Sequence, residues 1–210
     1  LNSGVEPNFL GVSYDRYSNV LASSLANTPP LNRDDKIRIG LLGMIDTGRR
    51  DYTCIINMLK DLPSEVRDRL VFLNLGACKD GLEDDVVKDF SRYVMFDCKE
   101  GFLSAEEFDE RGVSCHLLIS PLIEGKGEYH GTGSFGDAVY LRRKIILPHH
   151  ADKDNEFEEI AIYYNNYQGL VEVFENIEKF SLERVSPQYI EKFTTDCVFE
   201  TLMRDLRLCH

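Results

Sequence analysis

Short apolar runs alternate with helical patterns along most of this chain. From residue 36 onward, strands are predicted over residues 37–43, 70–75, 93–96, 113–119, 145–147 and 160–163. Between them, apolar residues recur at helical spacing over residues 52–62 and 82–90, after Ser104, after a glycine-rich turn, and over residues 169–180. Nearly continuous apolar strands indicate a parallel sheet covered on both faces. Right-handed crossovers then give a Rossmann-like, doubly wound α/β fold.

The two ends of the chain differ from this alternating region. Residues 1–35 hold turn-forming residues and little periodicity, which predicts a linker. Residues 36–180 form the predicted Rossmann-like domain. Residues 181–210 hold a predicted long C-terminal helix that starts at Ser186-Pro187, with Ser as N-cap and Pro at the first helical position, and runs to about Leu208. This helix covers either its own domain or a missing N-terminal domain.

Composition excludes several classes of function. The net charge of −12 and the pI of about 4.9 argue against a general nucleic-acid binder, which needs a basic surface. No apolar run approaches the ~20 residues of a membrane span, so we expect no transmembrane segment and a cytoplasmic protein. The six cysteines lack CxxC or Cys-His spacing, which predicts reduced, mostly buried thiols and no metal site. The acidic stretch 152–159 is expected to be a solvated loop.

A glycine-rich turn is the strongest candidate for ligand binding. Gly131, Gly133 and Gly136 punctuate residues 131–137, just before a predicted helix. Glycines let a backbone approach a ligand closely, and a helix N-terminus offers free N–H groups and partial positive charge. The amides of Gly133, Ser134 and Phe135 would then bind a phosphate. A tight turn with a capped helix and no ligand is the alternative.

Several other residues are expected near the same crevice. Ligands in such sheets bind at the carboxyl ends of strands, and both Gly43 and the glycine-rich turn follow such ends. Arg49 and Arg50 at the start of the first helix match phosphate oxygens in a bidentate way, although they could also be plain surface arginines. Asp137 has two interpretations, a capping box with Ser134 or a ligand for sugar hydroxyls.

The polar loop before the turn adds further candidates. Lys126 could meet a phosphate, Glu124 or Glu128 could meet hydroxyls, and His130 could carry a proton; Tyr129 and Gly131 complete the expected lining together with Met44. His149-His150 follow another strand end, whereas His116 is expected to be a core histidine. The turn lacks the Gly-Lys-Ser/Thr ending of a Walker A loop, and it lies too late in the chain for a dinucleotide fingerprint.

Residues 36–208 resemble a known family. They are similar to the C-terminal, nucleotide-sugar-binding half of retaining, glycogen-synthase-like glycosyltransferases with the GT-B fold. The resemblance rests on Gly43 with Arg49, on Ser120-Pro121 at a strand end, and on Asp137-Ala138 at a helix start. The sequence departs from the family at Tyr129, where the first of two glutamates is usual, and at Met44, where arginine is usual.

The resemblance implies a function for the expected crevice. A nucleotide-diphosphate sugar would be the donor, with Arg49, Arg50 and Lys126 neutralising its diphosphate and Asp137 holding the ribose. No cofactor or metal is implied, because this electrostatic stabilisation needs none. The acceptor site and any catalytic base would come from a missing N-terminal domain, so this chain alone is expected to transfer nothing. Two alternatives stay open, a non-catalytic α/β interaction domain and a sugar-nucleotide epimerase of the same architecture.

Overall fold

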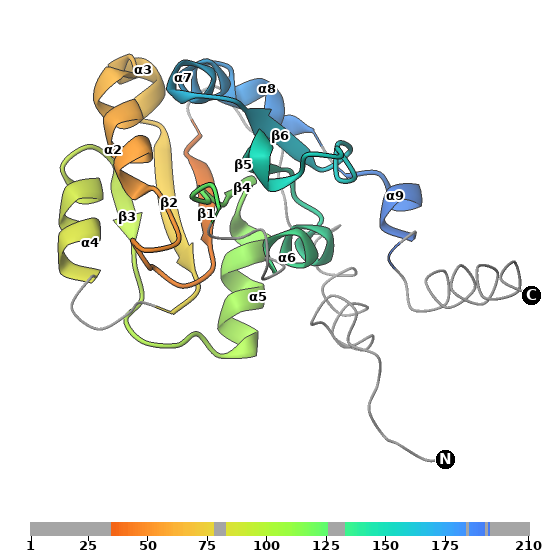
Figure 1. Ribbon diagram of the computed structural model, residues 1–210. Helices are drawn as coiled ribbons and strands as arrows, with labels where there is room; N and C mark the ends of the chain where they lie inside the picture. The colour runs from red at the N-terminus through yellow and green to blue at the C-terminus, as the bar shows by residue number, and fades with distance from the viewer. Residues whose placement is uncertain (1–34, 78–82, 126–132, 184, 192, 194–210) are drawn as a thin grey trace, which may run out of the picture.

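The computed structural model of this chain has a single parallel sheet at its centre (Figure 1). It describes residues 35–77, 83–125, 133–183, 185–191 and 193. The strands, in chain order, are β1 Ile37–Leu42, β2 Leu70–Leu75, β3 Met95–Asp97, β4 Leu117–Ile119, β5 Ile145–Pro148 and β6 Ala161–Tyr164. Their order across the sheet is β3-β2-β1-β4-β5-β6, and every pairing is parallel. This order confirms the predicted doubly wound, Rossmann-like fold.

Helices connect the strands and cover both faces of the sheet. They are α2 Tyr52–Asp61, α3 Ser64–Arg67, α4 Glu83–Ser91, α5 Ala105–Ser114, α6 Ser134–Leu141, the 3-10 turn η1 His149–Ala151, α7 Tyr167–Glu175, α8 Ile177–Leu182 and α9 Pro187–Glu191. One buried cluster joins the sheet to α2, α4 and α7, and a second joins it to α5, α6 and α9. Two cores explain why every residue of β1 except Arg38, and all of β2, is buried.

Local signals in the sequence account for several helix ends. Ser104 and Glu107 form the predicted capping box, since the Ser104 hydroxyl accepts from the Glu107 N–H at 3.2 Å and the Glu107 carboxylate accepts from the Ser104 N–H at 2.8 Å. Ser186 Oγ accepts from the Tyr189 N–H at 3.1 Å, which places it as the cap of α9, as predicted. The continuation of that helix to Leu208 lies outside the described residues, as do residues 1–34 of the predicted linker 1–35.

Three predicted boundaries are wrong. The expected helix over residues 169–180 is two helices, because the chain leaves helical geometry at Asn176, between α7 and α8. The strand expected to start at Val113 starts at Leu117, because α5 continues to Ser114. The strand expected over residues 93–96 is β3 at Met95–Asp97, because the turn after α4 holds the preceding residues through hydrogen bonds to Phe90 O.

Two polar residues show how burial is compensated in this fold. His116 is the predicted core histidine, and its Nδ1 accepts from the Arg38 N–H at 2.9 Å. Asp152, by contrast, is buried, so the expectation of a fully solvated acidic loop is wrong at this residue. Its carboxylate accepts from the backbone N–H groups of Glu156 and Phe157 and from the Tyr163 hydroxyl. Buried carboxylates require such partners, and these bonds fix the chain between β5 and β6.

Candidate functional site

The strand order sets the place of the candidate site. The connections run in opposite directions from β1 and from β4, so the gap beyond the carboxyl ends of these two strands is the topological switch point. Gly43 directly follows β1, and Ser120 directly follows β4. The sheet therefore brings together the two strand ends that the sequence predicts for the crevice.

The loops beyond β1 and β4 are bonded to each other. Arg50 and Leu122 form an antiparallel bridge. On either side of it, the Asp51 N–H donates to Pro121 O at 2.8 Å and the Ile123 N–H donates to Arg49 O at 3.1 Å. Within the first loop, Asp46 accepts from the N–H groups of Gly48, Arg49 and Arg50 at 2.9–3.1 Å. These bonds fix the backbone of the switch point without using the arginine side chains.

Gly43 allows two close approaches at this point. It has a φ of +78°, a left-handed conformation that favours glycine. A Cβ on the neighbouring Gly76 would lie 2.3 Å from the Gly43 carbonyl carbon, so the turns after β1 and β2 touch through backbone atoms alone. A Cβ on Gly43 itself would lie 2.0 Å from Nη2 of Arg50. The turn therefore accommodates a guanidinium where a side chain would otherwise stand.

Arg50 is the most unusual residue of the site. Its exposed fraction is 7%, although it is one of the two arginines expected at the surface or on a phosphate. Nη1 donates to Met44 O at 2.9 Å, while the buried Nε has no hydrogen-bond partner among the described residues. Burial lowers the pKa of its guanidinium, but arginine remains charged in proteins. A buried cation with a spare donor beside a glycine turn is well suited to an anion.

Helix α6 begins beside the end of β4, but its cap differs from the expected one. Gly133 is the N-cap and no side chain caps the helix, so the predicted capping box of Ser134 and Asp137 is wrong. Ser134 Oγ lies 3.0 Å from Ser120 Oγ instead, which ties the first turn of α6 to β4. The Phe135 ring stacks on Phe157 with centroids 4.0 Å apart. The Phe135 side chain is therefore used in packing.

The remaining candidates fall into three groups. Arg49 and Met44 are exposed on the loop after β1. Asp137 lies in the first turn of α6 and is half-buried. A final group, the loop candidates, lies outside the described residues: Lys126, Glu128, Tyr129, His130 and Gly131. The structure thus places Gly43, Arg50 and the start of α6 at neighbouring strand ends and gives no position for that group.

Other polar residues take structural roles or stand apart from the switch point. His149 and His150 form η1 after β5, where His149 Nε2 lies 3.1 Å from Asn155 Oδ1. The sequence singled out Ser120 by its position before Pro121 at a strand end, but it did not indicate that this hydroxyl would bond to Ser134. Across the described residues, no group of three or more His, Cys, Asp or Glu side chains is placed to hold a metal ion. In the same residues, no helix has the length and apolar character to cross a membrane.

Comparisons with known proteins find similarity of structure alone. No family model matches the sequence, and no curated protein matches it. The chain is similar to WaaB, a lipopolysaccharide outer core galactosyltransferase, with a TM-score of 0.61 and 11% identity over 87% of this chain and 52% of that one. It is similar to WaaG, a glycosyltransferase involved in lipopolysaccharide biosynthesis, with a TM-score of 0.52 and 12% identity over 83% of this chain and 45% of that one. It is also similar to TarM, with a TM-score of 0.54 and 15% identity over 85% of this chain and 36% of that one.

These likenesses identify the architecture. At such low identity they carry the fold and not the activity, and this chain spans about half or less of the length of each of the three proteins. The described part of this chain is a six-stranded parallel sheet with helices on both faces. The chain therefore has the fold of the C-terminal, Rossmann-like domain of GT-B glycosyltransferases.

Proposed function

We propose that this chain is the donor-binding half of a glycosyltransferase and binds a nucleotide-diphosphate sugar beyond the carboxyl ends of β1 and β4. One observation carries the proposal. Arg50 is buried at the switch point against the Gly43 turn, and its Nε has no partner among the described residues. A buried donor without an acceptor is costly, and the oxygen of a bound diphosphate would satisfy it.

The proposed roles follow from charge and position. Arg50 and the exposed Arg49 would neutralise the diphosphate, together with Lys126 and the amides of Gly133, Ser134 and Phe135. Stabilising a leaving diphosphate with fixed donors and cations is a recognised catalytic contribution that needs no metal ion. Asp137, in the first turn of α6, would hold the ribose hydroxyls.

The acceptor and any catalytic base are proposed to belong to another domain. This chain spans 52% of WaaB and 45% of WaaG, both named as glycosyltransferases. In this proposal the second half of the enzyme is an N-terminal acceptor-binding domain. The isolated chain would then bind the donor and transfer no sugar, and sugar transfer by these 210 residues alone would contradict this part of the proposal.

A nucleotide titration tests the proposal. We expect one of UDP, GDP and ADP to raise the melting temperature by about 3–6 °C at ten times its Kd, because binding to the folded state alone stabilises it. Arg49→Ala and Arg50→Met should each abolish most of this shift. Arg92→Ala is the matched control, since Arg92 is an exposed arginine on the turn after α4 that pairs with Asp89. The absence of a shift with all three nucleotides would remove the proposed function.

One observation favours the alternative of a non-catalytic α/β interaction domain. The Arg50 guanidinium itself fills the space above Gly43 and donates to Met44 O, so the turn has an internal occupant. In that case no nucleotide shift occurs and Arg50→Met changes only stability. A sugar-nucleotide epimerase of the same fold remains a third candidate, and it would convert the sugar of a bound donor without any acceptor.

A further inference from the structure

A polar side chain interrupts a strand that is otherwise apolar. All six residues of β2 are buried, and Asn74, with an exposed fraction of 0%, is the only one of them with a polar side chain. A buried amide is costly unless its donors and acceptors are paired, so an apolar residue would suit the packing between the two cores better. The partners of Asn74 show what the amide does at this position.

The Asn74 side chain joins the turn after β2 to the loop after β3. Its Nδ2 donates to Gly76 O and to Lys99 O, both at 2.9 Å. Its Oδ1 accepts from the Lys99 N–H at 2.9 Å and from Nη2 of Arg111 at 3.0 Å. Because carbonyls surround the nitrogen and N–H groups surround the oxygen, only one orientation of the amide fits. The amide therefore holds both loops in a defined position.

Arg111 supports this amide from α5. Its Nε donates to the main-chain oxygen of Asn74 at 3.1 Å, in addition to the bond from Nη2 to the side chain. Nη2 also donates to Asp97 O, and Nη1 pairs with the Asp97 carboxylate at 3.3 Å. One guanidinium thus holds the main chain and the side chain of Asn74 and links the carboxyl ends of β2 and β3.

The turn after β2 in turn supports the loop after β1. A Cβ on Gly76 would lie 2.3 Å from the Gly43 carbonyl carbon, so no side chain fits between these two turns. One residue further along each turn, the Ile45 N–H donates to Ala77 O at 2.8 Å. The loop after β1 therefore rests on the turn that the buried amide holds.

We propose that Asn74 is a positioning residue for Arg50 at the switch point. The Arg50 guanidinium lies against Gly43 and donates to Met44 O, so two of its contacts are with the loop that rests on Gly76. Without the amide, the turn after β2 is free to move, and Gly43 moves with it because close-packed segments transmit such shifts. The inference rests on the proposed function for the ligand of Arg50, whereas the position of the guanidinium is measurable in the free protein.

The test combines NMR of the free 210-residue chain with a nucleotide titration. Asn74→Asp keeps the size of the side chain but removes the amide donors to Gly76 O and Lys99 O. We expect the Nε–H signal of Arg50, identified by its loss in Arg50→Met, to shift and to exchange with water at least about tenfold faster. Whichever of UDP, GDP and ADP binds the wild-type chain should bind this variant about tenfold more weakly, the size of one charge-assisted hydrogen bond.

Gly76→Ala tests the same support from the other side of the contact. It leaves the amide of Asn74 in place but puts a methyl group 2.3 Å from the Gly43 carbonyl carbon, so the turn must shift. The Arg50 signal and the nucleotide affinity should change in the same direction as in Asn74→Asp. If Asn74→Asp does not fold, Gly76→Ala decides the question.

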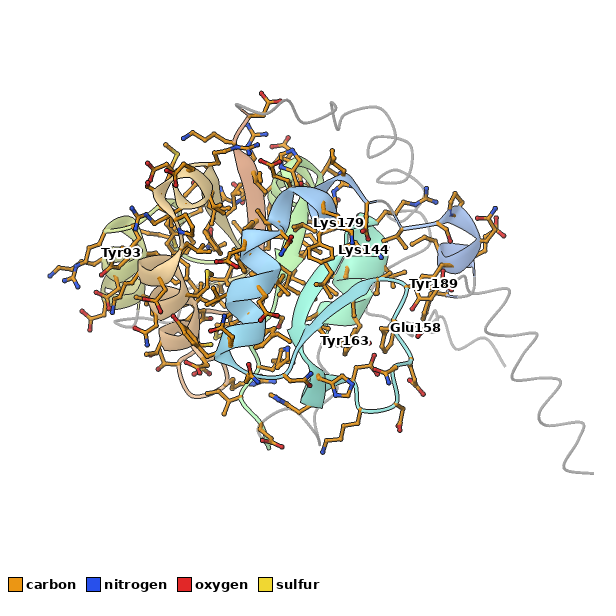
Figure 2. The ribbon with its side chains drawn as sticks, turned by 90° about the horizontal axis from the view of Figure 1, so that it is seen from above. Tyr93, Lys144, Glu158, Tyr163, Lys179 and Tyr189 are labelled. Carbon is orange, nitrogen blue, oxygen red and sulfur yellow. The ribbon has the colours of Figure 1, made fainter. Side chains whose placement is uncertain are left out.

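Two controls separate positioning from a general loss of stability. Asp97→Ala removes an exposed carboxylate from the same group of bonds without touching the turn after β2. Ile177→Ala creates a cavity under α8, at the opposite, amino end of the sheet. There Glu183, the C-cap of α8, pairs with Lys144 directly before β5, and Figure 2 labels Lys179 of this helix near Lys144. Both controls should leave the Arg50 signal and the nucleotide affinity as in the wild-type chain.

Three results would overturn the proposal. One is an unchanged Arg50 signal in the Asn74 and Gly76 variants, and another is an equal change in either control. The third is a displaced Arg50 signal with unchanged nucleotide affinity, because Asn74 would then have no bearing on the ligand. If no nucleotide binds the wild-type chain, the proposed function fails, whereas the Arg50 signal still shows whether Asn74 positions the guanidinium.

Discussion

The chain carries two pairs of adjacent arginines, Arg49-Arg50 after β1 and Arg142-Arg143 after α6, and each pair buries its second member. Arg143 has an exposed fraction of 2% and donates to Cys115 O at 2.7 Å and to Val113 O at 2.9 Å. Arg50, at 7%, donates to Met44 O and leaves its Nε unpaired among the described residues. Arg143 therefore satisfies several backbone carbonyls, whereas Arg50 satisfies one and keeps the unpaired Nε on which the proposed diphosphate site rests.

The largest loss of stability is expected for a substitution of Arg143, the arginine with the structural role. Arg143→Met removes the donors to two carbonyls at the end of α5, and buried carbonyls without partners are costly. We expect the free energy of unfolding to fall by about 3 kcal/mol, measured by urea denaturation. Arg92→Met, at an exposed arginine, should change it by less than about 0.5 kcal/mol. Equal effects of the two substitutions would contradict a structural role for Arg143.

Labelling of the Cys115 thiol reports on the local effect of Arg143→Met. Burial raises the pKa of its thiol to about 12, so the folded wild-type protein should not react there with a thiol reagent at pH 8. Because the Cys115 carbonyl is a partner of Arg143, Arg143→Met should expose this thiol to labelling, as peptide mapping by mass spectrometry would detect. Continued protection of Cys115 in the variant would show that the end of α5 does not depend on Arg143.

A smaller effect is expected for Gly43→Ala, which tests how closely Arg50 fits its turn. The substitution strains a backbone with a φ of +78° and places a methyl group 2.0 Å from the Arg50 guanidinium. We expect a loss of about 2 kcal/mol. In an Arg50→Met background the more flexible thioether relieves part of the contact, so the loss should be smaller by at least about 0.5 kcal/mol. If the losses of Gly43→Ala and Arg50→Met are strictly additive, the contact between residue 43 and the Arg50 side chain contributes nothing to stability.

Ser120→Ala should cost about 1 kcal/mol, the usual size for one buried hydrogen bond. It removes the bond between the hydroxyls of Ser120 and Ser134, which joins β4 to the first turn of α6. Ser114→Ala, at a half-buried hydroxyl that donates to Arg111 O at 2.7 Å, is a control for losing a local bond only. If donor binding needs α6 in its present position, Ser120→Ala weakens nucleotide binding and Ser114→Ala leaves it unchanged.

The smallest change in stability is expected for Arg50→Met. The substitution removes one bond to Met44 O together with a buried, incompletely paired cation, and these effects oppose each other. We expect the free energy of unfolding to change by less than about 1 kcal/mol, in contrast to Arg143→Met. A loss as large as that of Arg143→Met would place Arg50 among the structural arginines and remove the contrast between the two pairs.

The sequence was sufficient for the fold because its signals are local. Apolar runs identified every strand, and Ser104, Glu107 and Ser186 identified helix starts through contacts over three residues. Local signals did not predict contacts whose partners lie far away in the sequence. Nothing near Arg143 in the sequence indicates that α5 will supply its acceptors, and nothing near Asp152 indicates the hydroxyl of Tyr163.

The candidate site was predictable in part for the same reason. Because the carboxyl ends of parallel strands meet at one edge, Gly43 and the start of α6 could be assigned to one crevice. The inward turn of Arg50 and the choice of Gly133 over Ser134 as N-cap depend on contacts with the loops after β1 and β4.

The bonds between the loops after β1 and β4 have a mechanical consequence. The Arg50–Leu122 bridge and its two flanking bonds make these loops one rigid part, and Ile123 is close to the polar loop that begins at Glu124. A molecule that touches only the Arg49-Arg50 segment would therefore slow amide hydrogen exchange at Asp51 and Ile123 together. A displacement of the loop after β1 would then displace the loop after β4 as well, because the hydrogen bonds between them hold the two together.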